Sequence, residues 1–187
     1  MKTQNQLRFA FGKFLALAIG CSLLQSVHAA PLFDEGFNYP SGSHLGGNMN
    51  PGNSVAWSGS GTNLEIGSGN LTYSGLNDLG GNDLVVTSGT SVSGVNSYST
   101  VTSGSIYYSF LLDCTTVPTG NQAFSALENG STSPQGSSDP LAIYTGASGG
   151  SDFQIGIRTS GGGSGAVYVT GLSLNTTYLV VSELTFG

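Results

Sequence analysis

Short apolar runs recur along this chain, and clusters of Gly, Ser and Asn separate them. The clusters 80–82, 148–150 and 161–163 are typical of turns, because Gly tolerates positive φ and Asn and Ser bond to nearby backbone. Many short strands at such spacing favour an all-β antiparallel sandwich or barrel. No amphipathic helix of comparable clarity appears after residue 30. The expected strands are Leu32–Tyr39, Val55–Trp57, Asn63–Ile66, Asn70–Ser74, Asp83–Thr87, Gly104–Asp113, Gln122–Leu127, Pro140–Thr145, Asp152–Arg158, Gly165–Thr170 and Thr177–Phe186.

Side-chain alternation refines two of these expected strands. In 106–113 both alternate faces carry bulky side chains, which is typical of a central strand. In 152–158 the apolar residues Phe153, Ile155 and Ile157 alternate with Gly or polar residues. That pattern predicts a half-buried strand with one solvated face.

A basic and then apolar N-terminus predicts export. Three of the four basic residues lie within the first thirteen positions, and the mainly apolar stretch 9–24 overlaps and follows them. The small residues Val27 and Ala29 fit positions minus three and minus one of a cleavage site, so 1–29 is expected to be a signal peptide cut before Ala30. A membrane anchor is less favoured, because the stretch is short for a span of about 20 apolar residues.

The two cysteines raise separate questions. Cys21 follows a small residue, as in bacterial lipid-attachment signals, but Ala18 stands where a Leu or branched residue is usual. We therefore expect Cys21 to leave with the signal. Cys114 then has no internal disulfide partner and is expected to be a buried small hydrophobe, with an intermolecular bridge as the alternative.

The charge of residues 30–187 excludes several partners. Arg158 is their only Lys or Arg against ten carboxylates, so the formal charge is 1 − 10, or −9. Nucleic acid and anionic lipid are poor partners for such a surface, because phosphate needs cations to neutralise it. No membrane association is expected after signal cleavage. The length of this region fits a single β-sandwich domain.

Several motifs of this domain carry a resemblance. The segment 33–42 reads Phe-Asp-Glu-Gly-Phe-Asn-Tyr-Pro-Ser-Gly and is followed by Trp57, and apolar motifs follow at 106–112, 153–157 and 177–181. In this order they resemble a group of bacterial secreted proteins with a LamG-type, concanavalin A-like jelly-roll domain. The resemblance covers most of the chain after the signal and implies two curved antiparallel sheets, export and often attachment at the cell surface. Its motifs are structural and specify no ligand.

The end of the sequence departs from that pattern. After 177–181 those proteins continue through an acidic turn and further strands, whereas this sequence ends at Gly187. We therefore expect the domain 30–187 to be incomplete at its C-terminus, because a long apolar strand needs a partner to cover it. The alternative is a compact variant whose last strand is already internal.

The inventory of catalytic side chains is small. His44 is the only histidine after the signal, so neither a multi-His zinc site nor a Ser-His-Asp triad is easily built, and a solvated loop residue is expected. Jelly-roll glycosidases place closely spaced carboxylates on one strand, but Glu65, Glu128 and Glu183 each lack another carboxylate within four positions. We predict no catalytic residues. The alternative is a secreted glycan-active hydrolase whose carboxylates are paired by folding.

The loop 77–83 is the best candidate for calcium. Its sequence, Asn-Asp-Leu-Gly-Gly-Asn-Asp, offers the oxygen ligands that hard cations prefer, but it lacks the spacing of an EF-hand loop. The same residues are typical of tight turns. We therefore predict no metal ligand and no cofactor, and calcium stays an open alternative.

Aromatic side chains are the remaining candidates for ligand binding. Their flat apolar faces and polar tips suit stacking on sugars, although most aromatics of a β-sandwich pack in its core. The sequence thus predicts a secreted or cell-surface, non-catalytic module that binds a glycan or an envelope protein, or that has a structural role in the envelope or matrix. The aromatic candidates are Trp57, Tyr73, Tyr98, Tyr144 and Tyr168.

Overall fold

The chain divides into two compact units, Met1–Pro31 and Leu32–Gly187. The computed structural model describes residues 31–59, 62–76, 80–87, 94–128, 139–159 and 165–187. The predicted signal peptide 1–29, with its cleavage site at Ala29 and Ala30, lies outside the described residues, and so does Cys21.

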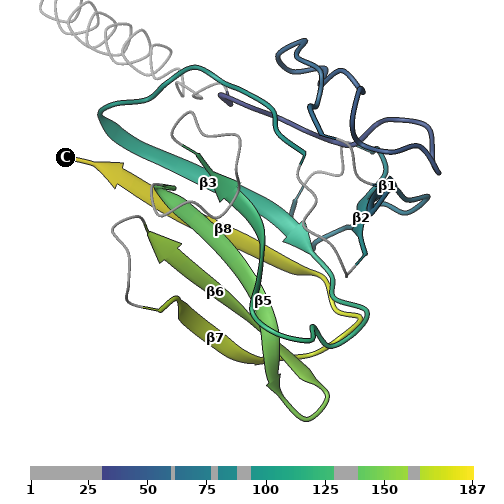
Figure 1. The fold of residues 1–187 in the computed structure, drawn as a ribbon, viewed down its shortest axis with the longest axis vertical. Helices are drawn as coiled ribbons and strands as arrows, with labels where there is room; N and C mark the ends of the chain where they lie inside the picture. The colour runs from purple at the N-terminus through teal and green to yellow at the C-terminus, as the bar shows by residue number, and fades with distance from the viewer. Residues whose placement is uncertain (1–30, 60–61, 77–79, 88–93, 129–138, 160–164) are drawn as a thin grey trace, which may run out of the picture. The chain divides into compact units, whose positions relative to one another are not determined.

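Eight strands form three antiparallel sheets, and the described residues contain no helix. A small sheet consists of β1 (Leu64–Ile66) and β2 (Leu84–Val86). A second sheet pairs β3 (Gly104–Leu112) along its whole length with β8 (Tyr178–Phe186). The third sheet has the order β4-β5-β6-β7 (Figure 1), and its strands are β4 (Gln122–Leu127), β5 (Leu141–Gly149), β6 (Asp152–Thr159) and β7 (Val167–Leu172).

The hydrophobic core lies between sheet β3–β8 and sheet β4–β7. Leu127, Leu141 and Ile143 are buried at its centre. The side chains packed around them come from both sheets and from the segment before β3, so the two sheets face each other as in a β-sandwich. This arrangement confirms the all-β, antiparallel prediction. The packed residues are Tyr98, Ile106, Tyr108, Phe110, Phe124, Ile155, Ile157 and Leu184.

Aromatic contacts join the sheets at two places. Phe110 of β3 meets Phe124 of β4 edge-on, with ring centroids 5.5 Å apart. Phe153 of β6, which is fully buried, meets Tyr178 of β8 at 5.8 Å. Edge-to-face pairs of this kind stabilise by about 1 kcal/mol beyond the area they bury. β3 therefore lies over β4, and β8 lies over β6.

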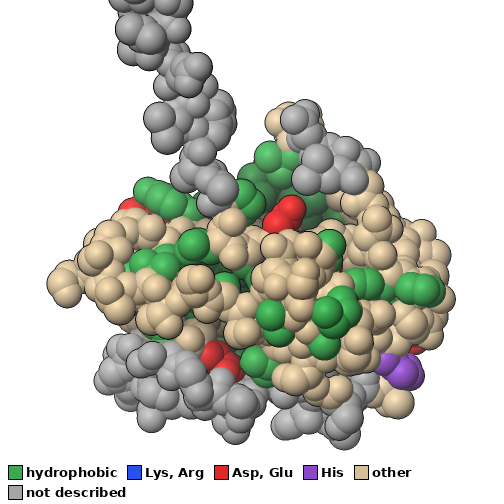
Figure 2. All heavy atoms as spheres, turned by 90° about the horizontal axis from the view of Figure 1, so that it is seen from above, with side chains coloured by type: hydrophobic (Ala, Val, Ile, Leu, Met, Phe, Trp, Pro, Cys, Tyr) green, Lys and Arg blue, Asp and Glu red, His purple; other side chains and the backbone are tan. Residues whose placement is uncertain are grey.

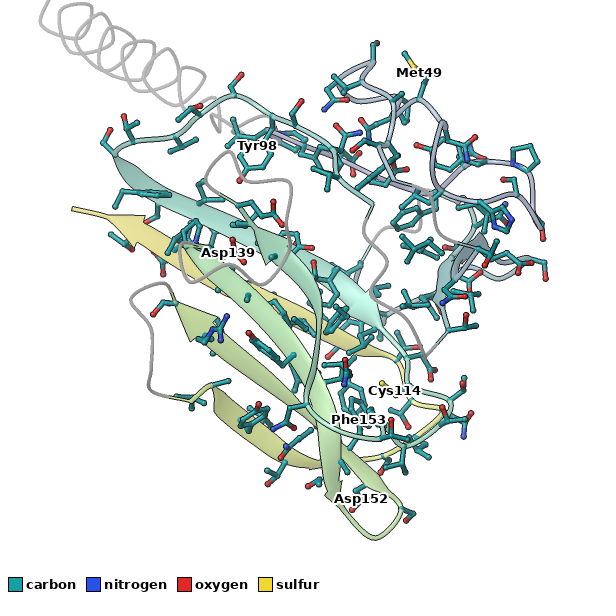
Figure 3. The ribbon with its side chains drawn as sticks, in the orientation of Figure 1. Met49, Tyr98, Cys114, Asp139, Asp152 and Phe153 are labelled. Atoms are coloured by element: carbon teal, nitrogen blue, oxygen red, sulfur yellow. The ribbon has the colours of Figure 1, made fainter. Side chains whose placement is uncertain are left out.

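The β5–β6 hairpin fixes the register of the larger sheet. The predicted turn at 148–150 is confirmed, since Gly149 and Gly150 have φ of 104° and 63° and Gly149 pairs with Asp152. L-residues with side chains rarely adopt such φ values. Asp152 lies at this turn, at the end of the hairpin farthest from Asp139 (Figure 3).

Three expected strands are wrong. The segments 32–39, 55–57 and 70–74 form no strand, and 55–57 makes only one isolated bridge, between Ala56 and Met49. In 32–39 the backbone of Phe37 has a φ of 50°, and its N–H donates to the Glu35 carboxylate instead of to a neighbouring strand. Apolar alternation therefore predicted a strand wrongly here, because a side-chain acceptor takes the backbone N–H that a neighbouring strand would otherwise bind.

The prediction that 106–113 forms a central strand is also wrong. Among the described residues β3 pairs only with β8. Its outward-facing Tyr107 is 68% exposed, and the Tyr107 hydroxyl donates to Glu183 Oε1 at 3.1 Å. The large side chain of Tyr107 suggested that this face of the strand is buried, but its ring and hydroxyl are exposed to solvent.

The core-facing side of β7 is largely exposed to solvent. Val167 and Val169 pair with Ile157 and Ile155 of β6, so they lie on the same face as the core, yet they are 75% and 64% exposed. The facing sheet has two strands against four, which leaves this end of the larger sheet uncovered by a described strand. The expected incompleteness of 30–187 stays a prediction.

Candidate functional site

Two of the five aromatic candidates are structural. The Trp57 indole N–H donates to Glu35 Oε2 at 2.8 Å, and its ring packs edge-on against Phe33. Tyr98 packs against the core, and burial raises the pKa of its phenol. A third candidate, Tyr73, is 43% exposed. None of these three shares a surface patch with another candidate in the contacts described here.

The other two candidates meet on the outer face of sheet β4–β7. Tyr144 of β5 and Tyr168 of β7 both pair with Gly156 of β6, which lies between them. A β-carbon added at Gly156 would lie 2.3 Å from the Tyr168 ring, so this ring rests directly on the glycine backbone. Gly156 therefore makes room for an aromatic side chain on the sheet surface.

Arg158 completes this aromatic group. Its guanidinium carbon lies 5.2 Å from the centroid of the Tyr144 ring, which is a cation–π distance. Arg158 pairs with Ala142, which is only 1% exposed. Arg158 makes no hydrogen bond or ion pair with any other described residue.

Two amides extend the group toward the β5–β6 turn. Gln154 Nε2 donates to Asn121 Oδ1 at 3.1 Å, and both side chains lie over Gly146. Gly146 pairs with Gln154 of β6, and this pair lies two residues along the strands from the pair of Tyr144 and Gly156. At about 3.3 Å per residue, the surface runs roughly 13 Å from Arg158 to Gln154.

We call Tyr144, Arg158, Tyr168, Gln154 and Asn121 the Tyr–Arg face. All but Asn121 are partly buried, so their positions are held by packing while one side stays open to solvent. Flat rings, amides and a guanidinium are the groups that stack on and bond to neutral polar ligands with hydroxyls. Sequence reasoning singled out the two tyrosines but missed Arg158, Gln154 and Asn121, which need the strand register to be grouped.

One pair of carboxylates is brought together by folding. Glu128 follows β4 and Asp139 precedes β5, and burial followed by the negative charge of Asp139 raises the pKa of Glu128. Asp139 is only 3% exposed, and Glu128 Oε2 is buried without a hydrogen bond from a described residue. Sequence reasoning considered Glu128 only as a carboxylate without a close neighbour in sequence, and so missed this pair.

The other candidate residues form no larger cluster among the described residues. His44 and Glu65 are exposed and make only an isolated backbone bridge with each other. Glu183 is exposed and bonded to Tyr107. Cys114 is partly buried, and burial followed by the charge of Asp113 raises the pKa of its thiol, which lowers its reactivity as a thiolate.

The described part of the loop 77–83 bonds to the chain itself. Asp83 Oδ1 accepts from the Gly69 N–H at 3.2 Å, and Asn82 Nδ2 donates to the Tyr39 carbonyl at 2.7 Å. Asp78 lies outside the described residues. Within the described residues no three His, Cys, Asp or Glu side chains gather as metal ligands.

Comparisons with known proteins give no relative. No family model, no curated protein and no solved structure matches this chain. Within the described residues there is no helix long and apolar enough to cross a membrane.

Proposed function

We propose that this protein is a secreted or cell-surface, non-catalytic β-sandwich module that binds a glycan on its Tyr–Arg face. The resemblance to bacterial LamG-type jelly-roll proteins and the predicted signal peptide support export. The acidic composition after residue 30 argues against nucleic acid. In Figure 2, Asp and Glu side chains are visible on the surface and no Lys or Arg side chain is, in keeping with the acidic composition.

One observation carries the proposal. Strand register places Tyr144 and Tyr168 on either side of the same residue, Gly156, on an outer sheet face where nothing in the core requires aromatic rings. The lone cation and the Asn121–Gln154 amide pair flank them. A fold of this class supports many functions, so the proposal rests on these side chains and not on the sandwich itself.

A glycan array with matched variants tests this function. Tyr168→Ala and Tyr144→Ala should each weaken binding about tenfold or more. Stacking on an aromatic ring contributes on the order of 1 kcal/mol, and removing the ring also takes packing contacts from the neighbouring side chains. Tyr73→Ala is the matched control, since Tyr73 is exposed elsewhere, and it should bind as the unmodified domain does. Absence of glycan binding by the folded domain would refute the proposal.

A second candidate function, a secreted glycan-active hydrolase, is favoured by the Glu128 and Asp139 pair. Two neighbouring carboxyls in different environments can divide into an acid and a base, and the raised pKa of Glu128 suits the acid. Screening polysaccharides for release of reducing ends tests it. Activity that Glu128→Gln abolishes, while Glu65→Gln retains it, would establish the hydrolase and displace the non-catalytic function.

A further inference from the structure

Arg158 stands alone in a strongly acidic domain. After residue 13 it is the chain's only Lys or Arg, and ten carboxylates follow residue 33. With so many carboxylates available, an ion pair would be the ordinary fate of a single cation, yet Arg158 makes none with a described residue. Its guanidinium rests instead on the Tyr144 ring. No described residue therefore occupies its donors, which can serve water or a ligand.

The chemistry of the guanidinium selects the ligand group. Its planar fork of N–H donors matches a carboxylate with two parallel hydrogen bonds, which a point charge such as Lys cannot reproduce. The Tyr144 ring restrains the group, so less side-chain entropy is lost when a ligand binds. Because Arg158 is partly buried, its attraction for a carboxylate is screened less than at a fully exposed site.

We propose that the glycan carries a carboxylate, and that a uronate unit places this carboxylate on Arg158 while a sugar ring stacks on Tyr144 or Tyr168. This inference rests on the glycan-binding function proposed above and names its ligand class. The amides of Gln154 and Asn121, at the other end of the face, bond to hydroxyls of neighbouring neutral sugars.

The charge of the whole domain limits how many uronates the ligand carries. A formal charge of −9 after the signal repels a dense polyanion, and only one cation offsets it. The preferred ligand is therefore a mainly neutral glycan with isolated uronates. A polyuronate should bind more weakly at low salt and recover as salt screens the repulsion.

Titration calorimetry with a mixed oligosaccharide that contains one uronate tests the inference. The probes are this oligosaccharide, its carboxyl-reduced form, an analogue that carries a sulfate ester in place of the carboxylate, and a polyuronate. For the unmodified domain, carboxyl reduction should weaken binding about tenfold or more. Arg158→Gln should bind the acidic and reduced forms equally, and Arg158→Lys should keep only part of the preference. A thermal melt of each variant confirms that it is folded.

The outcomes separate this inference from the function beneath it. Equal binding of acidic and reduced forms by the unmodified domain, with loss in Tyr168→Ala, would overturn the uronate and leave glycan binding intact. Preference for the sulfated analogue would also overturn it. Failure of every probe, together with an empty glycan array, would remove the proposed function itself.

Discussion

At the scale of single residues, Glu35 organises the segment before β1. One carboxylate oxygen accepts the Phe37 N–H at 2.7 Å, and the other accepts the Tyr39 hydroxyl, Asn50 Nδ2 and the Trp57 indole N–H within 2.8 Å. Asn50 is fully buried and also bonds to loop backbone. The motif that carried the family resemblance is thus a hydrogen-bond network around one anion, and it explains why 32–39 is no strand.

Replacing Glu35 should destabilise the domain. Glu35→Ala leaves Asn50 and the Trp57 indole without their shared acceptor. We expect the free energy of unfolding to fall by about 3 kcal/mol, because donors that lose a charged acceptor inside the protein stay unsatisfied. Glu35→Gln should cost less, since one acceptor oxygen remains. Urea unfolding followed by fluorescence of Trp57, the only tryptophan, measures both. Glu65→Gln, at an exposed position, is the control, and an equal loss there would contradict this account.

A second residue-scale prediction concerns pH. Burial and Asp139 raise the pKa of Glu128 above its ordinary 4.5, so in that range the folded protein binds more protons at Glu128 than the unfolded chain does. Its contribution therefore favours folding at acid pH and is lost as pH rises from about 4.5 through the folded pKa. Urea midpoints of the unmodified domain and Glu128→Gln, compared between pH 4 and 7, should diverge as pH rises, with the variant more stable at pH 7. Parallel profiles would contradict the assignment.

At the scale of elements, the packing of Tyr168 on Gly156 couples β6 to β7. Gly156→Ala would place a methyl group 2.3 Å from the ring, and we expect about 1–3 kcal/mol of destabilisation. Gly165→Ala, where a β-carbon meets nothing within 4 Å, should change stability little. In a double-mutant cycle, Gly156→Ala should cost much less in a Tyr168→Ala background. Additive losses would show that the ring is not what the methyl group meets.

The elements also show how far sequence patterns reach. Most expected strands from 63 onward are confirmed. In these segments apolar and polar residues alternate between Gly-rich turns, because one face of the strand is buried and the other is exposed. The one exception there, 70–74, forms no strand. The Tyr–Arg face was only half predicted, because alternation places Tyr144 on a face but does not say which residue of β6 lies opposite it. Only the Gly149 turn sets that register, and with it the grouping of Arg158.

At the scale of the whole molecule, the two larger sheets differ in width. Two strands face four, so the core is shielded over β4, β5 and β6 but not over β7. An apolar surface on the inner side of a sheet favours association with other apolar surfaces. The free edge of β8 adds unpaired backbone groups beside it, since β3 is its only partner among the described strands.

This asymmetry predicts a separation of stability from self-association. Val167→Thr with Val169→Thr should change the free energy of unfolding by about 0.5 kcal/mol or less, because both side chains are already mostly in water. The same pair should reduce binding of an apolar dye and lower the apparent mass of the domain at high concentration in analytical ultracentrifugation. Ile143→Thr is the matched control at a buried position and should cost about 2 kcal/mol or more. A large loss of stability in the valine pair would mean that these side chains are covered in solution, by a second copy or by another segment, and the concentration dependence of the melting temperature would distinguish the two.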